Sequence, residues 1–430
     1  MRIRAAGPSP SLVFLAACGP NPSAELSEPV TLDEAGASNP TAAVDPTSGD
    51  AYVAWVGDPD GSGNVQLVRW PSGGSPEPPV RVNDVPGDAA PHLQAPAQVV
   101  ADSGGRVYVL WQNNTHVPGR EYPASDLRFA RSLDGGRTFA PAVTVNDDPE
   151  GAPPTSHTFH DMVMGPKGEI VVSWIDSRDA QGGELGAEDA GEADSITTEV
   201  GAHEHHGMGD GGTGGPDIRI AVSRDGGATF SASRIADRNA CPCCRTNVAV
   251  GPAGEIFVAW RKVFEGNVRD VVVARSPDGG ANWEAPVRVH SDEWVFGGCP
   301  HAGPGLAVDQ DGRVHVAWYT GKEGRPGLYF ASSHDGGITF SEPASLLDAG
   351  WAPPSQVDLL AAGPRLWASW EERGRETPAI LVSSANGMEP PRRGDAMRFD
   401  GTNPSLAGSE ARQVLAWLDG ETVKVVARGG

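Results

Sequence analysis

Short apolar segments that end in tryptophan recur along the whole chain. They are rich in Val, Ile, Leu and Ala, which is typical of short β-strands. Most follow another apolar segment and a turn, as in 42–45, 162–165 and 306–309. Each unit is therefore predicted to be a small antiparallel meander. The tryptophan-ending segments are 51–55, 107–111, 170–174, 256–260, 314–318, 366–370 and 414–417.

The spacing of these units predicts an all-β fold in one domain. Four short strands that repeat every ~45–60 residues are the mark of a β-propeller, in which each blade buries its face on the next. The last unit ends without a fourth strand, while residues 28–32 resemble the fourth-strand segment 140–145. We therefore expect seven four-stranded antiparallel blades over residues 26–430, with the N-terminal strand closing the ring.

A second repeat lies after the third strand of four units. The Asp of each copy can accept backbone N–H groups, and its glycines can adopt positive φ. The four copies are 132–139, 223–230, 276–283 and 333–340. They resemble the Asp-box, or BNR repeat, of sialidase-like propellers, Ser-x-Asp-x-Gly-x-Thr-Phe/Trp. The resemblance implies the scaffold rather than the chemistry, because Asp-boxes also occur in propellers that cleave nothing. Sialidases themselves have six blades, which is the alternative count.

Two segments stand outside the repeat. Residues 1–18 contain two arginines, an apolar run and Leu15-Ala16-Ala17-Cys18, which resembles the lipobox of bacterial lipoproteins, with Cys18 as the lipidated residue. This predicts an extracytoplasmic protein with a lipid anchor in a bacterial membrane. Residues 181–215 form an acidic insert with His203-Glu204-His205-His206, whose composition predicts a disordered loop.

Net charge restricts the partners. The formal net charge of -23 would repel phosphate backbones, and no basic patch reverses it, so nucleic acid is not an expected partner. We expect a monomer that binds a small molecule, glycan or protein at one propeller face. The membrane is expected to be contacted only through the anchor.

Candidate ligands for a soft metal gather on one face. In a propeller, the links between blades and those between second and third strands share the face opposite the Asp-box turns. One inter-blade link carries Cys-Pro-Cys-Cys, and the next carries Cys-Pro-His. Thiolate and imidazole suit copper or zinc. Disulfides are the alternative for an exported chain with paired cysteines, and thiol redox chemistry is a third. The candidate ligands are Cys241, Cys243, Cys244, Cys299, His301, His157 and His160.

A sialidase would need different residues on the same face. It needs arginines that clamp a substrate carboxylate, a Tyr paired with a Glu as nucleophile, and an Asp as acid/base. The candidate catalytic residues are Tyr319, Glu371, and Asp161 or Asp270. The candidate clamp residues are Arg178, Arg245, Arg261, Arg269, Arg325 and Arg373. The Phe-Arg-Ile-Pro motif that sialidases commonly carry is absent from the chain, and these arginines can equally pair with loop acids.

Three functions remain open from the sequence. The leading one is an exported propeller that binds a ligand or metal at the Cys/His cluster. The alternatives are an exo-glycosidase of sialidase type and a non-enzymatic scaffold for protein interactions.

Overall fold

The computed structural model describes residues 26–33, 36–57, 63–120, 123–180, 214–348, 356–373, 377–386 and 389–429. Cys18 and nearly all of the acidic insert lie outside these residues, so the expectations for them stay predictions. No helix in the described chain is long and apolar enough to cross a bilayer. Its helical segments are the short 3-10 turns η2 (Glu265–Asn267) and η3 (Arg393–Asp395).

Seven four-stranded antiparallel sheets surround a common axis, which confirms the predicted seven-bladed propeller and excludes the six-bladed alternative. Blade 1 consists of β2 (Thr41–Val44), β3 (Ala51–Gly57), β4 (Asn64–Trp70) and β5 (Val80–Arg81). Blade 2 consists of β6 (Gln98–Ala101), β7 (Val107–Gln112), β8 (Leu127–Ser132) and β9 (Val143–Thr144). Blade 3 consists of β10 (His157–Met164), β11 (Ile170–Asp176), β12 (Asp217–Ser223) and β13 (Arg234–Asp237). Blade 4 consists of β14 (Asn247–Val250), β15 (Ile256–Phe264), β16 (Val268–Ser276) and β17 (Val287–Arg288).

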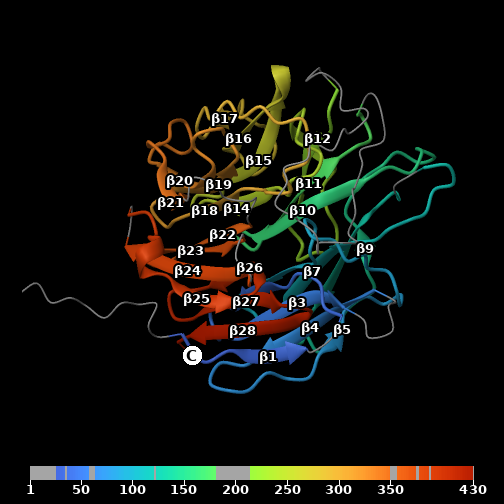
Figure 1. Ribbon diagram of the computed structural model, residues 1–430. Helices are drawn as coiled ribbons and strands as arrows, with labels where there is room; N and C mark the ends of the chain where they lie inside the picture. Colours follow the sequence, from blue (N-terminus) through green and yellow to red (C-terminus); the bar gives the residue numbers. More distant parts are fainter. Residues whose placement is uncertain are drawn as a thin grey trace, which may run out of the picture.

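The remaining strands complete the ring. Blade 5 consists of β18 (Gly305–Val308), β19 (Val314–Thr320), β20 (Gly327–Ser333) and β21 (Ala344–Asp348). Blade 6 consists of β22 (Val357–Ala362), β23 (Arg365–Glu372), β24 (Ala379–Asn386) and β25 (Met397–Asp400). Blade 7 is β26 (Thr402–Gly408), β27 (Gln413–Asp419), β28 (Thr422–Arg428) and β1 (Val30–Asp33). First strands such as β14, β18 and β22 gather near the centre of Figure 1, and β5, β9 and β17 lie at the rim.

The second strand of each blade forms the core. Its tryptophan packs between neighbouring sheets, and burying one indole contributes about 4 kcal/mol from the apolar area alone. These tryptophans are at most 2% exposed: Trp55, Trp111, Trp174, Trp260, Trp318, Trp370 and Trp417. Repetition of the same buried contact at each interface explains why the apolar pattern recurs.

Polar side chains near the axis join each blade to the next. Asp161 of β10 accepts a hydrogen bond from the backbone N–H of Val248 (2.8 Å). In the same way, Asn247 accepts from the N–H of Leu306 (2.9 Å). These bonds fix the register between neighbouring first strands. Related bonds to the following blade are made by Thr41, Asp358 and Ser405.

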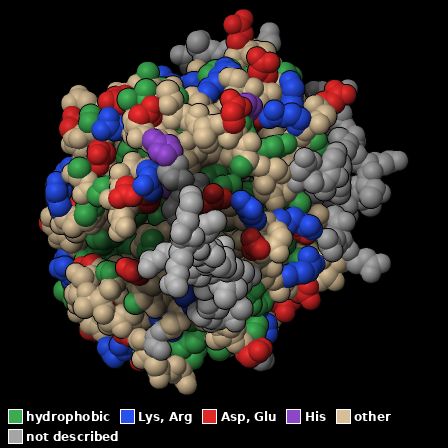
Figure 2. All heavy atoms as spheres, turned by 90° about the vertical axis from the view of Figure 1, so that its left-hand side faces the viewer, with side chains coloured by type: hydrophobic (Ala, Val, Ile, Leu, Met, Phe, Trp, Pro, Cys, Tyr) green, Lys and Arg blue, Asp and Glu red, His purple; other side chains and the backbone are tan. Residues whose placement is uncertain are grey.

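The N-terminal strand closes the ring as the sequence indicated. Strand β1 pairs antiparallel with β28, with Val30 opposite Val425 and Thr31 opposite Lys424. The two lie side by side in Figure 1, where the blue and red ends of the chain meet. On the face in Figure 2, basic and acidic side chains are interspersed, and neither sign forms a continuous patch there.

Candidate functional site

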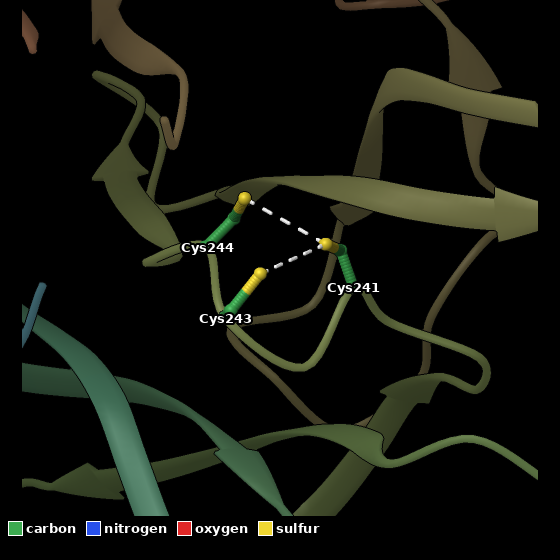
Figure 3. A group of neighbouring side chains, drawn as sticks. All are labelled: Cys241, Cys243 and Cys244. Carbon is green, nitrogen blue, oxygen red and sulfur yellow. Dashed lines mark hydrogen bonds between the residues drawn. The ribbon is translucent and has the colours of Figure 1, made fainter. Parts of the chain in front are cut away.

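Three cysteine sulfurs point toward one another in the link between β13 and β14 (Figure 3). The Sγ of Cys241 lies 3.6 Å from that of Cys243 and 3.7 Å from that of Cys244. All three side chains are at most 1% exposed. The tight Cys-Pro-Cys-Cys turn achieves this because Cys243 and Cys244 face Cys241 across the loop. We call Cys241, Cys243 and Cys244 the inner triad.

None of the described cysteines forms a disulfide. A disulfide requires a sulfur separation of about 2.05 Å, far less than the 3.6 Å between Cys241 and Cys243. The structure therefore does not contain the bridges that the sequence left open as an alternative.

Two buried arginines border the inner triad. Arg269 donates from Nη1 to the Sγ of Cys241 (2.9 Å) and from Nε to the carbonyl of Phe296 (2.6 Å). Arg261 donates to the carbonyls of Arg269 (2.9 Å) and Tyr319 (2.7 Å). Both arginines are 1% exposed, so their positive charges act on the thiols with little screening by solvent.

This environment shifts the pKa values of the three thiols in different directions. Burial alone would raise the pKa of Cys241, but its hydrogen bonds with Cys243 and Cys244 and the charges of Arg269 and Arg261 outweigh burial, so the pKa of Cys241 lies well below the ordinary value. Burial and the neighbouring thiols raise the pKa of Cys243. Burial and Cys241 raise the pKa of Cys244, against opposing effects of Cys243 and Arg261. Deprotonation is therefore favoured at Cys241 over Cys243 and Cys244.

A second set of ligand atoms adjoins the inner triad. Cys243, Cys299 and His301 place their ligand atoms within 4.8 Å of one another, as do the three members of the inner triad. Cys299 and His301 are partly exposed, unlike the inner triad. His301 has a left-handed backbone (φ 48°), which costs a non-glycine residue about 1 kcal/mol. Its carbonyl accepts a hydrogen bond from Gln356 (2.8 Å).

His157 lies in a different cluster from the cysteines. Its Nδ1 is 2.7 Å from the carbonyl of Ser125, and its Nε2 is 3.1 Å from Asp148 and 3.5 Å from Asp176. Burial tends to lower the pKa of His157, but Asp148 and Asp176 outweigh it and raise the pKa. His157 is therefore placed as the cation of a buried ion pair, with Asp126 also near.

His160 and Asp161 are adjacent buried residues of β10 with different surroundings. The Nε2 of His160 is 3.0 Å from the carbonyl of Pro96, and burial lowers its pKa to about 3. Asp161 lines a narrow axial cavity together with Arg245 and Asp358. Burial raises the pKa of Asp161 to about 7, against backbone hydrogen bonds and the charge of Arg245.

The remaining candidates of the sialidase hypothesis are spread over several blades. Tyr319 packs edge-on against Trp294, and burial raises its pKa although Arg261 opposes this. Glu371 forms an ion pair with Arg373 (2.7 Å). The other candidates pair locally with protein groups: Asp270 with Arg288, Arg325 with Asp292, and Arg178 with Asp176 and Asp147.

Sequence reasoning missed two sets of partners. It assigned Arg261 and Arg269 to a substrate clamp, whereas the structure places them beside the inner triad. It also did not foresee Asp148 and Asp126 around His157. The run Asn146-Asp147-Asp148, directly after a fourth strand, was an available signal because that link lies on the same face as His157.

Comparison with known proteins shows the fold. No family model and no curated protein matches the chain. Polysaccharide lyase Uly1 superposes with a TM-score of 0.55 at 11% identity, over 94% of this chain and 99% of the lyase. A PL25 ulvan lyase bound to a GlcA-Rha3S saccharide gives 0.54 at 12%, over 93% and 95%. The Hadza microbial sialidase Hz136 gives 0.48 at 17%, over 82% and 66%, and we draw nothing from that likeness.

Proposed function

We propose that this protein binds a copper(I) ion at the inner triad. The observation that carries the proposal is the convergence of three buried, unbridged sulfurs on one point. Cysteines that serve only packing have no need to aim their sulfurs at one another, and soft thiolates favour metals such as Cu(I) and zinc.

The spacing of the sulfurs suits a metal. Metal–sulfur bonds of about 2.3 Å place two sulfurs of a three- or four-ligand site about 3.8–4.0 Å apart. The measured 3.6 and 3.7 Å from Cys241 need adjust by only a few tenths of an ångström. A metal could therefore enter without rebuilding the loop.

Charge favours a monovalent ion. Three thiolates and one Cu(I) carry a formal charge of -2, which the guanidinium groups of Arg261 and Arg269 neutralise. Zn(II) in the same place would leave a net positive charge, and uncompensated charge in a buried site is costly. Export through the segment ending at Cys18 belongs to the same proposal and would place the site outside the cytoplasm.

The test is anaerobic loading of the reduced, untagged protein with Cu(I), followed by a chelator challenge and elemental analysis. We expect retained copper, with one ion fewer per chain in Cys241→Ser and in Cys244→Ser than in the wild type. Thr246→Val is the matched control, because Thr246 is also buried in this link but offers no ligand. Copper-free protein that still contains four reactive thiols would overturn the proposal, as would preferential retention of zinc.

A glycosidase is the second candidate because of Asp161. A carboxyl group with a pKa of about 7 in the axial cavity has the protonation behaviour of a general acid. If this activity exists, a fluorogenic sialoside is cleaved and both Asp161→Asn and Tyr319→Phe reduce the rate at least ~100-fold, the contribution typical of general acid catalysis. No release of the fluorophore, or a rate equal to that of the wild type in both variants, rules out these roles.

A further inference from the structure

We propose that the site holds two Cu(I) ions, with Cys243 as the ligand that both share. This inference rests on the proposed function and extends it to a second position, formed by Cys243, Cys299 and His301. The two ligand sets each fit within 4.8 Å and have only Cys243 in common. A thiolate sulfur has more than one lone pair and can bind two metal ions at once.

The two positions differ in access. All members of the inner triad are buried, whereas Cys299 and His301 are partly exposed. We call the position formed by Cys243, Cys299 and His301 the outer position. An ion arriving from solvent therefore meets the outer position first. Transfer inward needs only exchange of Cys299 and His301 for Cys241 and Cys244, while the bond to Cys243 is kept.

Charge balance also holds for two ions. The four thiolates of Cys241, Cys243, Cys244 and Cys299 carry -4, two Cu(I) ions supply +2, and Arg261 and Arg269 supply +2, with His301 neutral. The formal sum is zero. Two zinc ions would instead leave +2 in a largely buried cluster, which again favours the monovalent metal.

The protein supports the outer position from the neighbouring blade. His301 is fixed by its left-handed backbone and by the hydrogen bond from the Gln356 side chain to its carbonyl. The His301 imidazole, whose ligand nitrogen lies near Cys243 and Cys299, can complete a mixed sulfur and nitrogen site, a ligand set that copper accepts.

Titration with Cu(I) under anaerobic conditions, read as copper retained per chain against a competing chelator, tests the inference. We expect two equivalents in the wild type, one in Cys299→Ser and in His301→Ala, and one in Cys244→Ser. Cys243→Ser should lose both. Thr246→Val should keep two. X-ray absorption of the fully loaded wild type should show a copper–copper vector that Cys299→Ser lacks.

The outcomes separate the two proposals. Zero equivalents in the wild type defeats copper binding altogether. One equivalent in the wild type, unchanged in Cys299→Ser, leaves the inner site standing and overturns the shared-ligand site. Two equivalents without a copper–copper vector would mean independent sites, which also overturns the role of Cys243.

Discussion

At residue 157, a histidine that the sequence grouped with the cysteines lies instead among carboxylates. Its ring is 1% exposed and contacts Asp148, Asp176 and the carbonyl of Ser125. With acceptors at both ring nitrogens, the protonated form is favoured, which is why its pKa is raised. Sequence spacing can place a histidine on a face, but only the fold shows which partners its nitrogens reach.

The raised pKa of His157 makes stability depend on pH. A folded pKa above the unfolded value of about 6.5 contributes stability that is fully present below pH 6.5 and is lost as pH rises through the folded pKa. We expect the free energy of unfolding of His157→Gln to be about 1–2 kcal/mol lower than that of the wild type at pH 5.5. The difference between the two proteins should be smaller at pH 9. Urea unfolding at several pH values measures this. The exposed His334→Gln serves as control, and parallel curves for wild type and His157→Gln would contradict the assignment.

The cysteine cluster shows how much of the candidate site could be predicted from the sequence alone. Two Cys-containing links in successive blades were enough to predict one cluster, in which Cys243 lies close to Cys299. The roles of Arg261 and Arg269 could not be predicted, because second-to-third strand arginines can point to solvent, to a substrate or inward. Their direction depends on Trp294 and Phe296, which contact Arg261 and Arg269 from the next link.

At the level of elements, the four repeated turns at 132–139, 223–230, 276–283 and 333–340 share one hydrogen-bond pattern. In the first, the Ser132 hydroxyl donates to Asp134 (2.7 Å) and accepts from the N–H of Gly136 (2.8 Å). Asp134 accepts in turn from the N–H groups of Arg137 and Thr138. Such local bonds explain why the turns were readable from sequence. The two-residue fourth strands β5, β9 and β17 were harder to delimit, because so few backbone bonds define their ends.

Removing the serine hydroxyl from one of these turns should destabilise the whole blade. Ser132 is 1% exposed, so Ser132→Ala leaves the buried N–H of Gly136 without its acceptor, at a cost of about 1–3 kcal/mol. Denaturant unfolding followed by tryptophan fluorescence is the measurement. Ser75→Ala, on an exposed turn of blade 1, should change stability by less than ~0.5 kcal/mol. A neutral Ser132→Ala would show that the turn does not need this bond.

At the level of the whole molecule, the ring depends on contacts between the two ends of the chain. Besides the β1 and β28 ladder, Ser27 donates its N–H to the carbonyl of Ala427 (2.8 Å), and Asp33 accepts from the indole of Trp55 (3.2 Å). Val30 and Leu32 pack on the core between blades 7 and 1. The β1 strand therefore contributes both to the sheet of blade 7 and to the interface between blades 7 and 1, although it is only four residues long.

Deleting β1 should open the ring. A chain that starts at residue 36 loses the burial of Val30 and Leu32 and leaves β28 as an unpaired edge, so we expect a loss of about 3 kcal/mol and concentration-dependent aggregation. A chain that starts at residue 26 is the control and should match the longer protein in thermal unfolding. Adding a peptide of residues 26–35 should restore the melting temperature, because it can pair with β28 in trans. The same peptide with Val30→Asp should fail, since it would bring a charge into the interface between blades 7 and 1. Equal stability of the chains that start at 26 and 36 would show that the ring does not rely on this closure.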